Sequence, residues 1–230
     1  MARRGQFIVF EGIDGSGKRT QLELLVRALS KRGVPLERIS FPRYDGFFGR
    51  LVAQFLNGDF GTLEAVDPHL AAILYAGDRF EAKAKIEAIL ASGKTLLADR
   101  YIASNLAHQA ARAPRQKRGA FVRWIKRLEY EIYKLPAEDA VIYLRVPAEA
   151  AHAQIGAKGA REYTKLSRDI LESNLAHLAD AAEVYDSLAR APNWVQIECF
   201  DEKTGAMRPP DEIHADVLAA IDSREPAAHV

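Results

Sequence analysis

The sequence predicts an α/β fold with a five-stranded parallel sheet flanked by helices. Short aliphatic and β-branched runs alternate with longer helical patterns, which is typical of strands and helices layered around such a sheet. Each run is apolar at nearly every position, as expected of strands buried on both faces. A glycine-rich turn joins the first run to the first helical pattern. The five predicted strands are Phe7 to Phe10, Leu36 to Phe41, Thr95 to Ala98, Ala140 to Val146 and Trp194 to Ile197.

Helical patterns fill the gaps between these strands. The first runs from Lys18 to Arg32, with leucines at helical spacing, and Gly33 ends it. The second begins at Asp67-Pro68, where Asp caps and Pro occupies the first turn, and extends to Gly93. The remaining predicted helices are Gly119 to Lys134, Pro147 to Ile155, Leu166 to Ala189 and Pro210 to Ile221.

Length and composition place the chain among ordinary globular proteins. Its 230 residues are read as a single domain, 1–230, with a short basic insertion at about 156–165. The 48% hydrophobic and 27% charged residues exclude disordered, collagen-like and coiled-coil classes, and a net charge of +1 gives no chain-wide attraction to nucleic acid or an anionic membrane. No apolar run reaches membrane-spanning length. The lone Cys199 cannot form an intramolecular disulfide, and we expect a cytoplasmic protein.

The glycine-rich turn has the pattern of a phosphate-binding loop. It follows a strand and opens a helix, so its backbone N–H groups and the helix N-terminus can hold a triphosphate while Lys18 reaches the β and γ phosphates. The predicted ATP-binding residues are Gly12, Ile13, Asp14, Gly15, Ser16, Gly17, Lys18, Arg19 and Thr20.

One position of this loop departs from the motif. Ser or Thr, whose hydroxyl ligates Mg²⁺, normally follows the lysine, but Arg19 stands there, and Thr20 points about 100° further round the helix. Three alternatives stay open: Arg19 points away and leaves the metal to water and phosphates, it stabilises phosphate charge, or it is an ordinary solvated helix residue.

A second pair of charged residues follows the third strand. Asp99 stands at the carboxyl end of a buried strand, where open α/β sheets bind ligands, and it is placed to orient Mg²⁺ or its waters. Arg100 offers a planar fork for a second phosphate. The alternative is an ion pair between neighbours at the strand end.

At this point the sequence resembles the thymidylate kinase family. Over residues 7 to about 110 its motifs occur in the family's order and spacing. They are Phe7-Ile8-Val9-Phe10-Glu11-Gly12-Ile13-Asp14-Gly15-Ser16-Gly17-Lys18, Phe41-Pro42-Arg43-Tyr44, Leu74-Tyr75-Ala76-Gly77-Asp78-Arg79, Asp99-Arg100-Tyr101 and Ser104 through Gln109.

The resemblance implies a P-loop kinase fold and an enzyme that uses ATP and Mg²⁺ to phosphorylate dTMP to dTDP, a step of dTTP biosynthesis. It assigns Asp14 to the sugar hydroxyl, Arg100 to the acceptor phosphate and Asp99 to the catalytic site. Tyr75 and Arg79 lie on one helix face, where a stacking ring beside a guanidinium suits a pyrimidine. The other acceptor-site positions are Phe41 against thymine, with core packing as its alternative, Arg43 near the phosphate, Gln109 for the base, and Ser104 and Asn105 in the loop after the third strand.

The basic insertion resembles the family's lid, Gly156 to Lys165. The lid is expected to supply a catalytic arginine because Gly15 stands where some members carry one in the phosphate-binding loop. Arg161 is the candidate, although the order Arg161-Glu162-Tyr163 inverts the usual one and leaves Lys158, Lys165 and Arg19 in competition. Tyr163 resembles a lid tyrosine beside the deoxyribose. We expect no general base, since an ionised phosphate oxygen is the nucleophile and none of the six histidines is well placed.

The sequence also leaves other functions and partners open. The enzyme could instead act on dUMP or several nucleoside monophosphates, or be a nucleotide-binding regulatory protein with weak catalysis. The stretch Arg112 to Arg127 is basic, but Phe121 and Trp124 at helical spacing favour a core position over nucleic-acid stacking. By resemblance we expect a homodimer packed through helices that include parts of Asp67 to Gly93, and no membrane or nucleic-acid partner.

Overall fold

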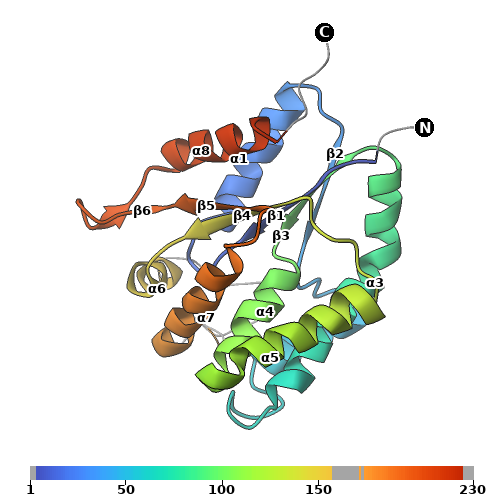
Figure 1. Ribbon diagram of the computed structural model, residues 1–230, viewed down its shortest axis with the longest axis vertical. Coiled ribbons are helices and arrows are strands. Elements are labelled where there is room, and N and C mark those ends of the chain that lie inside the picture. The colour runs from blue at the N-terminus through green and yellow to red at the C-terminus, as the bar shows by residue number, and fades with distance from the viewer. Residues whose placement is uncertain (1–3, 157–170, 172–173, 225–230) are drawn as a thin grey trace.

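The computed structural model describes residues 4–156, 171 and 174–224 and contains the predicted parallel sheet (Figure 1). Its strand order is β2-β3-β1-β4-β5, with every neighbouring pair parallel. The strands are β1 (Phe7–Glu11), β2 (Leu36–Ser40), β3 (Thr95–Asp99), β4 (Ala140–Arg145) and β5 (Trp194–Glu198). All five sequence-predicted strands are therefore confirmed, each to within a residue at its ends.

Helices cover both faces of this sheet. In Figure 1, α1 and α8 lie on one side of it, and α4, α5 and α7 lie on the other, with α3 alongside. The bounds are α1 (Lys18–Lys31), α2 (Phe47–Leu56), α3 (Pro68–Ala91), α4 (Ile102–Ala111), α5 (Arg115–Lys126), which continues as the π-helix η1 (Arg127–Ile132), α6 (Ala148–Gly156), α7 (Leu175–Leu188) and α8 (Pro210–Asp222). A small antiparallel hairpin, β6 (Phe200–Asp201) and β7 (Ala206–Met207), follows β5.

Several predicted helix boundaries were wrong. The helix predicted from Leu166 begins at Leu175, because the Asn174 side chain accepts a hydrogen bond from the His177 amide at 3.0 Å and caps it. Residues 166–170 lie outside the described part of the chain. The helix predicted over 119–134 begins at Arg115 and ends in the π-helix. Helices α2 and α4 and the β6–β7 hairpin were not predicted.

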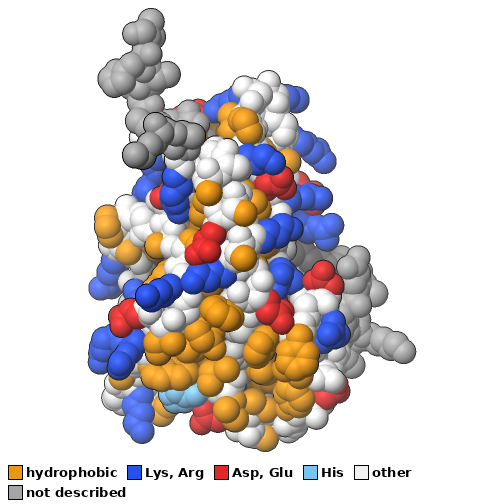
Figure 2. Space-filling view, turned by 90° about the vertical axis from the view of Figure 1, so that its right-hand side faces the viewer, with side chains coloured by type: hydrophobic (Ala, Val, Ile, Leu, Met, Phe, Trp, Pro, Cys, Tyr) orange, Lys and Arg blue, Asp and Glu red, His pale blue; other side chains and the backbone are white. Residues whose placement is uncertain are grey.

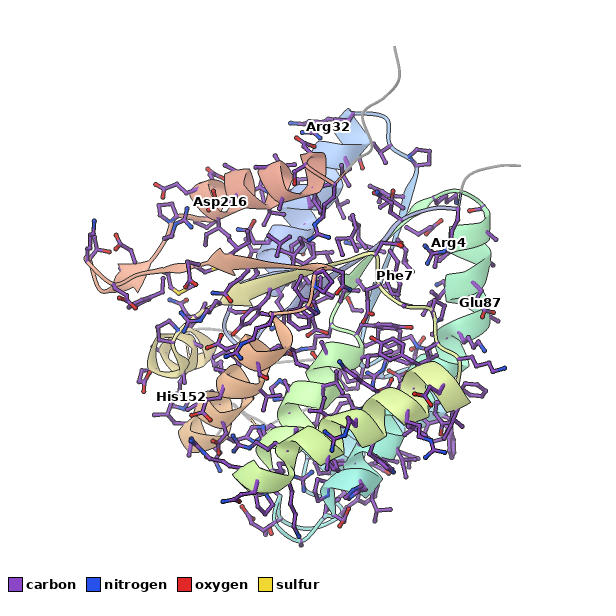
Figure 3. All side chains as sticks on the ribbon, in the orientation of Figure 1. Arg4, Phe7, Arg32, Glu87, His152 and Asp216 are labelled. Atoms are coloured by element: carbon purple, nitrogen blue, oxygen red, sulfur yellow. The ribbon has the colours of Figure 1, made fainter. Side chains whose placement is uncertain are left out.

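The core fills both layers between sheet and helices. Phe7 is fully buried at the start of β1, and its ring meets that of Tyr101 edge-on at 4.9 Å between centroids (Figure 3). On the opposite face, Arg32 at the end of α1 forms an ion pair with Asp222 of α8 at 2.5 Å, which ties the two covering helices together.

The sheet register brings three loops to one edge. Phe10 of β1 and Ser40 of β2 both pair with Asp99 of β3, so the three strands end level with one another. The ladder continues one step beyond the strands: the Phe41 amide donates to the Asp99 carbonyl, and the Arg100 amide to the Phe10 carbonyl, each at 3.0 Å. The loops that follow these strands therefore start side by side and build one site.

Within the described residues, no helix is both long enough and apolar enough to cross a membrane.

Candidate functional site

The loop between β1 and α1 requires glycine at two positions. Gly12 has φ +143°, and a Cβ there would lie 2.6 Å from the Leu144 carbonyl oxygen. Gly15 has φ +87°, and a Cβ there would lie 2.2 Å from the backbone oxygen of Ala151 in α6. Side chains at these positions would be strained and would collide with backbone. An arginine at position 15 is thus excluded, which fits the expectation that a catalytic cation comes from elsewhere.

Lys18 is the buried cation of this loop. Its Nζ donates to the carbonyl oxygens of Gly12 and Ile13 at 3.0 and 2.9 Å. Burial, together with the charge of nearby Arg100, lowers the pKa of the Lys18 ammonium to about 8. The loop therefore holds Lys18 buried, at an electrostatic cost that an anionic ligand would relieve.

Arg19 points away from this loop into solvent. Its side chain is 85% exposed, and its Nε donates to Glu23, one helical turn on, at 3.1 Å. Thr20 is also exposed. Of the three alternatives for Arg19, the geometry agrees with the two in which the side chain does not contact phosphate: it points away from the loop, and it is solvated on the helix.

Arg100 lies at the centre of the site. Its backbone has a left-handed φ of +66°, a conformation that costs energy for a residue with a side chain and is found most often at functional sites. The guanidinium donates to Asp14 at 2.5 Å and to the Ser104 hydroxyl at 2.9 Å. Burial would lower the pKa of Arg100, but the charge of Asp14 raises it well above its ordinary value, so the cation is permanent.

Glu11 anchors the helix that carries most of the acceptor-site residues. This fully buried carboxylate accepts from the amides of Tyr101 and Ser104 at 2.8 and 3.1 Å, and from the hydroxyls of Ser104 and Tyr185 at 2.7 and 2.8 Å. It therefore fixes the N-terminus of α4 against β1 and α7. Ser104 and Asn105 were expected in a loop but lie on α4, which corrects that prediction.

Asp99 remains partly open at the end of β3. Its Oδ1 is buried and has no hydrogen-bond partner among the described residues. A carboxylate oxygen is a ligand that Mg²⁺ favours, and Mg²⁺ commonly takes one or two carboxylates besides waters and phosphates. The residue present at this edge therefore fits the metal that the sequence analysis expected.

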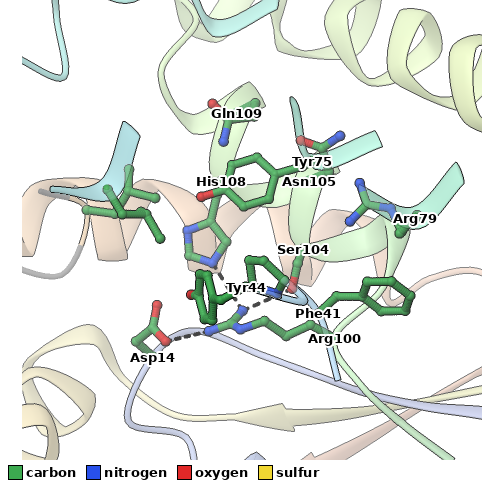
Figure 4. Close-up of a pocket in the computed structure, with 13 residues that line it drawn as sticks. Asp14, Phe41, Tyr44, Tyr75, Arg79, Arg100, Ser104, Asn105, His108 and Gln109 are labelled. Atoms are coloured by element: carbon green, nitrogen blue, oxygen red, sulfur yellow. Dashed lines mark hydrogen bonds and ion pairs between the residues drawn. The ribbon is translucent and has the colours of Figure 1, made fainter. Parts of the chain in front are cut away.

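A pocket of about 540 Å³, part of it open to solvent, opens beside these residues (Figure 4). Every predicted acceptor-site residue that the structure describes lines it, except Arg43. The lining residues that were not predicted come from the loop after β2, from α2, from α4 and from the segment just before α7. The lining comprises Asp14, Phe41, Pro42, Tyr44, Leu56, Tyr75, Arg79, Arg100, Ser104, Asn105, His108, Gln109 and Leu171.

Aromatic and aliphatic side chains form one wall of the pocket. Phe41 is 5% exposed and packs against the Tyr101 ring at 5.7 Å, so it serves the core and the pocket together. Tyr75 on α3 is half-buried, with its ring edge-on to Phe55 at 6.4 Å. Leu56 and Leu171 belong to the same apolar cluster, which gives the pocket a surface suited to a flat, partly apolar ring.

Arg79 lies in a buried ion pair, which the sequence did not indicate. Its Nε and Nη2 donate to the two oxygens of Glu129 at 2.6 and 2.7 Å, and both side chains are almost fully buried. Burial would lower the pKa of Arg79, but the charge and hydrogen bonds of Glu129 raise it. The pair is buried, with Arg79 in the pocket wall and Glu129 behind it. Glu129 could have been noticed in the sequence, because it continues the buried stripe of Phe121 and Ile125 at i+4 spacing.

Two amides on α4 present unused polar atoms to the pocket. Asn105 Nδ2 donates to Glu129 and to the Ala72 carbonyl at 2.8 and 3.0 Å, while its Oδ1 is buried and unpartnered within the described chain. Gln109 Oε1 accepts from Arg112 at 2.7 Å, while its Nε2 is likewise buried without a partner in the described residues. One helical turn apart, an acceptor and a donor are thus available to a ligand.

A histidine also lines the pocket, contrary to the expectation that none is well placed. His108 lies one turn after Ser104 on α4; its Nε2 is 3.5 Å from Arg100 Nη1, and its Nδ1 is 3.3 Å from His177 Nε2. Burial and then the charge of Arg100 lower the pKa of His108 well below its ordinary value, so it is neutral at pH 7. The missed helix α4 explains the missed residue, because the i+4 relation to Ser104 exists only on a helix.

Arg43 is held beside the pocket by two acidic residues of α3. Its backbone amide and Nε donate to Asp78 at 2.8 and 3.1 Å, and its Nη2 donates to Glu81 at 3.3 Å. Burial raises the pKa of Asp78, although the hydrogen bonds and charge of Arg43 oppose this rise. The structure thus fixes Arg43 at the rim of the pocket, and its guanidinium donates hydrogen bonds to residues of α3.

The lid residues Lys158, Arg161, Tyr163 and Lys165 lie outside the described residues. The basic stretch of α5 is described, and two of its arginines face α7: Arg118 pairs with Asp180 at 2.8 Å, and Arg115 with Glu183 at 2.6 Å. Phe121 is buried, as its helical spacing predicted. These two arginines therefore link α5 to α7.

Comparisons with known proteins converge on one family. The family model described as Thymidylate kinase matches residues 10–208. A thymidylate kinase of Mycobacterium tuberculosis is 33% identical over 188 residues, covering 81% of this chain and 86% of its own, and a probable thymidylate kinase of Pyrobaculum aerophilum is 32% identical over 217 residues, covering 94% and 95%. A thymidylate kinase structure from Candida albicans superposes with a TM-score of 0.74 at 21% identity, covering 96% of this chain and 93% of that one, which shows the same fold.

Proposed function

Since the chain belongs to the thymidylate kinase family, we propose that it transfers the γ-phosphoryl group of ATP to the 5′-phosphate of dTMP, giving dTDP and ADP. One observation of the pocket carries the choice of acceptor. A buried acceptor, Asn105 Oδ1, and a buried donor, Gln109 Nε2, share a wall with Tyr75 and have no partner within the described chain. A thymine ring offers an N–H flanked by carbonyl oxygens and a flat face, which matches these atoms.

The donor nucleotide would bind at the loop of Gly12 to Lys18. The inward-folded backbone and the N-terminus of α1 favour an anion there, and Lys18 supplies the buried positive charge. Asp99 Oδ1 is the protein atom that would hold Mg²⁺, directly or through a water. When bound, Mg²⁺ neutralises charge on the phosphates.

The acceptor phosphate would bind at Arg100. This guanidinium stands at the end of β3, level with the phosphate-binding loop, so a phosphate on it would face the terminal phosphate of ATP across the site. Asp14, now bonded to Arg100, would turn to the sugar hydroxyl. The reaction then needs positioning and charge stabilisation and no general base, because the attacking phosphate oxygen is already ionised. The neutral, buried His108 fits this view: it lies against Arg100 and would help to hold it.

The lid is proposed to supply the remaining cation, with Arg161 as first candidate, Lys158 and Lys165 as competitors, and Tyr163 beside the deoxyribose. Arg19, the fourth competitor, is turned to solvent and paired with Glu23. Water exclusion by such a segment would keep ATP from being hydrolysed before dTMP binds.

A substrate panel tests this proposal. Purified protein would be incubated with ATP and Mg²⁺ and with dTMP, dUMP, dCMP, dGMP, UMP or no acceptor, and each diphosphate product would be measured directly. We expect turnover of about 1 to 100 s⁻¹ with dTMP, typical of kinases, and little with dCMP or dGMP. Equal rates with several acceptors would remove the pyrimidine site from the proposal. Absence of product from a folded protein that binds both nucleotides would favour the regulatory alternative.

We also propose that the chain is a homodimer packed through the outer face of α3. Large apolar side chains are exposed there and on its neighbours: Phe47 of α2, Leu70 and Phe80 of α3, and Ile132 of η1, with Phe80 49% exposed and the others about 60%. Figure 2 shows hydrophobic side chains gathered over the lower half of this side of the molecule. An apolar patch of this kind on a globular protein commonly marks an interaction surface.

A further inference from the structure

Glu129 belongs to neither the pocket lining nor the phosphate sites, yet it contacts two residues of the pocket wall. It stands on η1, is fully buried, and accepts from Arg79 Nε and Nη2 and from Asn105 Nδ2. All three donor atoms lie within 2.6 to 2.8 Å of its carboxylate. Such short bonds to a buried anion are among the stronger polar contacts in proteins.

These contacts fix the orientation of the Asn105 amide. Both N–H groups of Asn105 are used, one by Glu129 Oε1 and one by the Ala72 carbonyl. An ionised carboxylate only accepts hydrogen bonds, and so does a carbonyl. If the amide flipped, its oxygen would face two acceptors in a buried place, with no hydrogen between them. Glu129 therefore holds Asn105 so that the oxygen is the polar atom left for the pocket.

The same carboxylate fixes Arg79. Glu129 takes Nε and one N–H of Nη2 in a bidentate pair, which leaves Nη1 and the second N–H of Nη2 as the remaining donors of a residue that lines the pocket. The two parallel bonds hold the planar guanidinium in the orientation seen here. The pocket wall thus presents an acceptor from Asn105 and a donor from Arg79, both set by one residue behind them.

We propose that Glu129 is a positioning residue that makes the base site selective for a pyrimidine with a ring N–H and a 4-carbonyl. This inference rests on the proposed function and assigns its specificity to a residue outside the pocket. Thymine and uracil offer a 4-carbonyl acceptor beside a ring N–H, whereas cytosine offers a 4-amino donor beside a ring nitrogen that accepts. With Glu129 in place, the ring nitrogen of cytosine, an acceptor, would face the oxygen of Asn105. The 4-amino group of cytosine, a donor, would face the N–H groups of Arg79.

The test is the variant Glu129→Gln. Glutamine keeps the shape but offers one oxygen and one NH₂ group, so it can no longer accept from Arg79 Nε, Arg79 Nη2 and Asn105 Nδ2 together. Its NH₂ group opposes at least one of these donors, so Arg79 and Asn105 are no longer held in one orientation. We expect the KM for dTMP to rise about tenfold to a hundredfold with kcat changed far less, because a charge-assisted hydrogen bond behind the site is lost. The preference for dTMP over dCMP in kcat/KM should fall at least tenfold.

Two further measurements separate positioning from general damage. The ratio of kcat/KM for dTMP to that for dUMP should not change, since thymine and uracil carry the same ring N–H. The KM for ATP should not change either, since ATP does not bind at the base site. The matched control is Glu138→Gln, a second buried glutamate, bonded at 2.7 Å by Tyr130, the residue next to Glu129. Burial raises the pKa of Glu138 to about 7, so it is already near half-protonated at neutral pH and its glutamine variant should keep the wild-type selectivity. An unchanged dTMP-to-dCMP preference in Glu129→Gln, or an equal loss in both variants, would overturn the inference.

A measurement on the wild-type protein covers the case in which Glu129→Gln does not fold. The NH₂ signals of Asn105, assigned by their loss in Asn105→Asp, should exchange slowly with solvent and should keep their positions when dTMP binds, because both protons point away from the pocket. Fast exchange, or a large shift on dTMP binding, would show that the amide is not held by Glu129. Failure of the proposed function would look different, since wild-type protein would then not phosphorylate dTMP at all.

Discussion

The lowered pKa of Lys18 predicts that ATP binding weakens as pH rises above 8. Burial, with a smaller contribution from Arg100, brings this pKa from 10.5 to about 8. Bound phosphates would restore the charged form, so above pH 8 the protein must take up a proton to bind ATP. Between pH 7.5 and 9.5 the fraction of charged Lys18 falls about 25-fold, and the Kd for ATP should rise by that factor, about 2 kcal/mol.

Isothermal titration with ATP over this range measures the effect directly. The phosphate groups of ATP are fully ionised there, since a phosphate's second pKa is near 6, so the slope reports on the protein. The matched control is Lys18→Met, which should bind ATP more weakly but with no slope from this group. A wild-type Kd that changes less than about threefold across the range, or a slope that persists in Lys18→Met, would refute the argument.

The same lowered pKa has the opposite effect on stability. The unfolded chain binds more protons than the folded one between pH 8 and 10.5, so the contribution of Lys18 to the free energy of unfolding rises with pH in that window. Between pH 7.5 and 9.5 the difference between wild type and Lys18→Met should move by about 2 kcal/mol in favour of wild type. Urea unfolding at both pH values measures it, and a constant difference would contradict the buried, charged lysine.

Three further variants test other parts of the structure. Arg19→Thr should leave the free energy of unfolding within about 0.5 kcal/mol and the KM for ATP within about threefold, because it removes one exposed pair with Glu23; urea unfolding and steady-state kinetics measure both. Ser104→Ala should cost about 1.5 to 3 kcal/mol in urea unfolding and raise the KM for dTMP more than that for ATP, since its hydroxyl bonds both Glu11 and Arg100; equal changes in the two KM values would contradict this. Phe80→Glu should halve the mass measured by light scattering if α3 forms the dimer face, and Lys85→Glu, elsewhere on the same helix, should not.

The sheet and the phosphate-binding loop could be predicted because their signals are local. Each strand is a continuous apolar run, and the loop needs glycine where a Cβ would meet backbone, as at Gly12 and Gly15. Helix α4 carries no such signal. Nearly all of Ile102 to Ala111 is buried, so the polar face that reveals an amphipathic helix is missing, and its buried Asn105, His108 and Gln109 look like loop residues in the sequence.

The partners of the predicted site residues depend on contacts between segments that are distant in sequence. Glu129 is 50 positions from Arg79, and nothing near Arg79 indicates that its guanidinium is already paired. The direction of the Arg19 side chain could not be predicted either, because the motif gives the position of this residue after Lys18 and not its orientation. In the structure Glu23, one turn on, pairs with its side chain in solvent.

The two buried arginines of the site, Arg79 and Arg100, differ in whether a ligand can replace the carboxylate that pairs with them. A buried guanidinium destabilises the fold unless a carboxylate compensates it, and Asp14 and Glu129 do this for Arg100 and Arg79. Asp14 lines the pocket, so an incoming phosphate competes with it, and the net gain on binding is smaller than the phosphate contact alone. Glu129 lies behind the wall and is not displaced. Exchange at Arg100 therefore favours release of the product phosphate, whereas the permanent pair at Arg79 keeps the same base-reading geometry through every turnover.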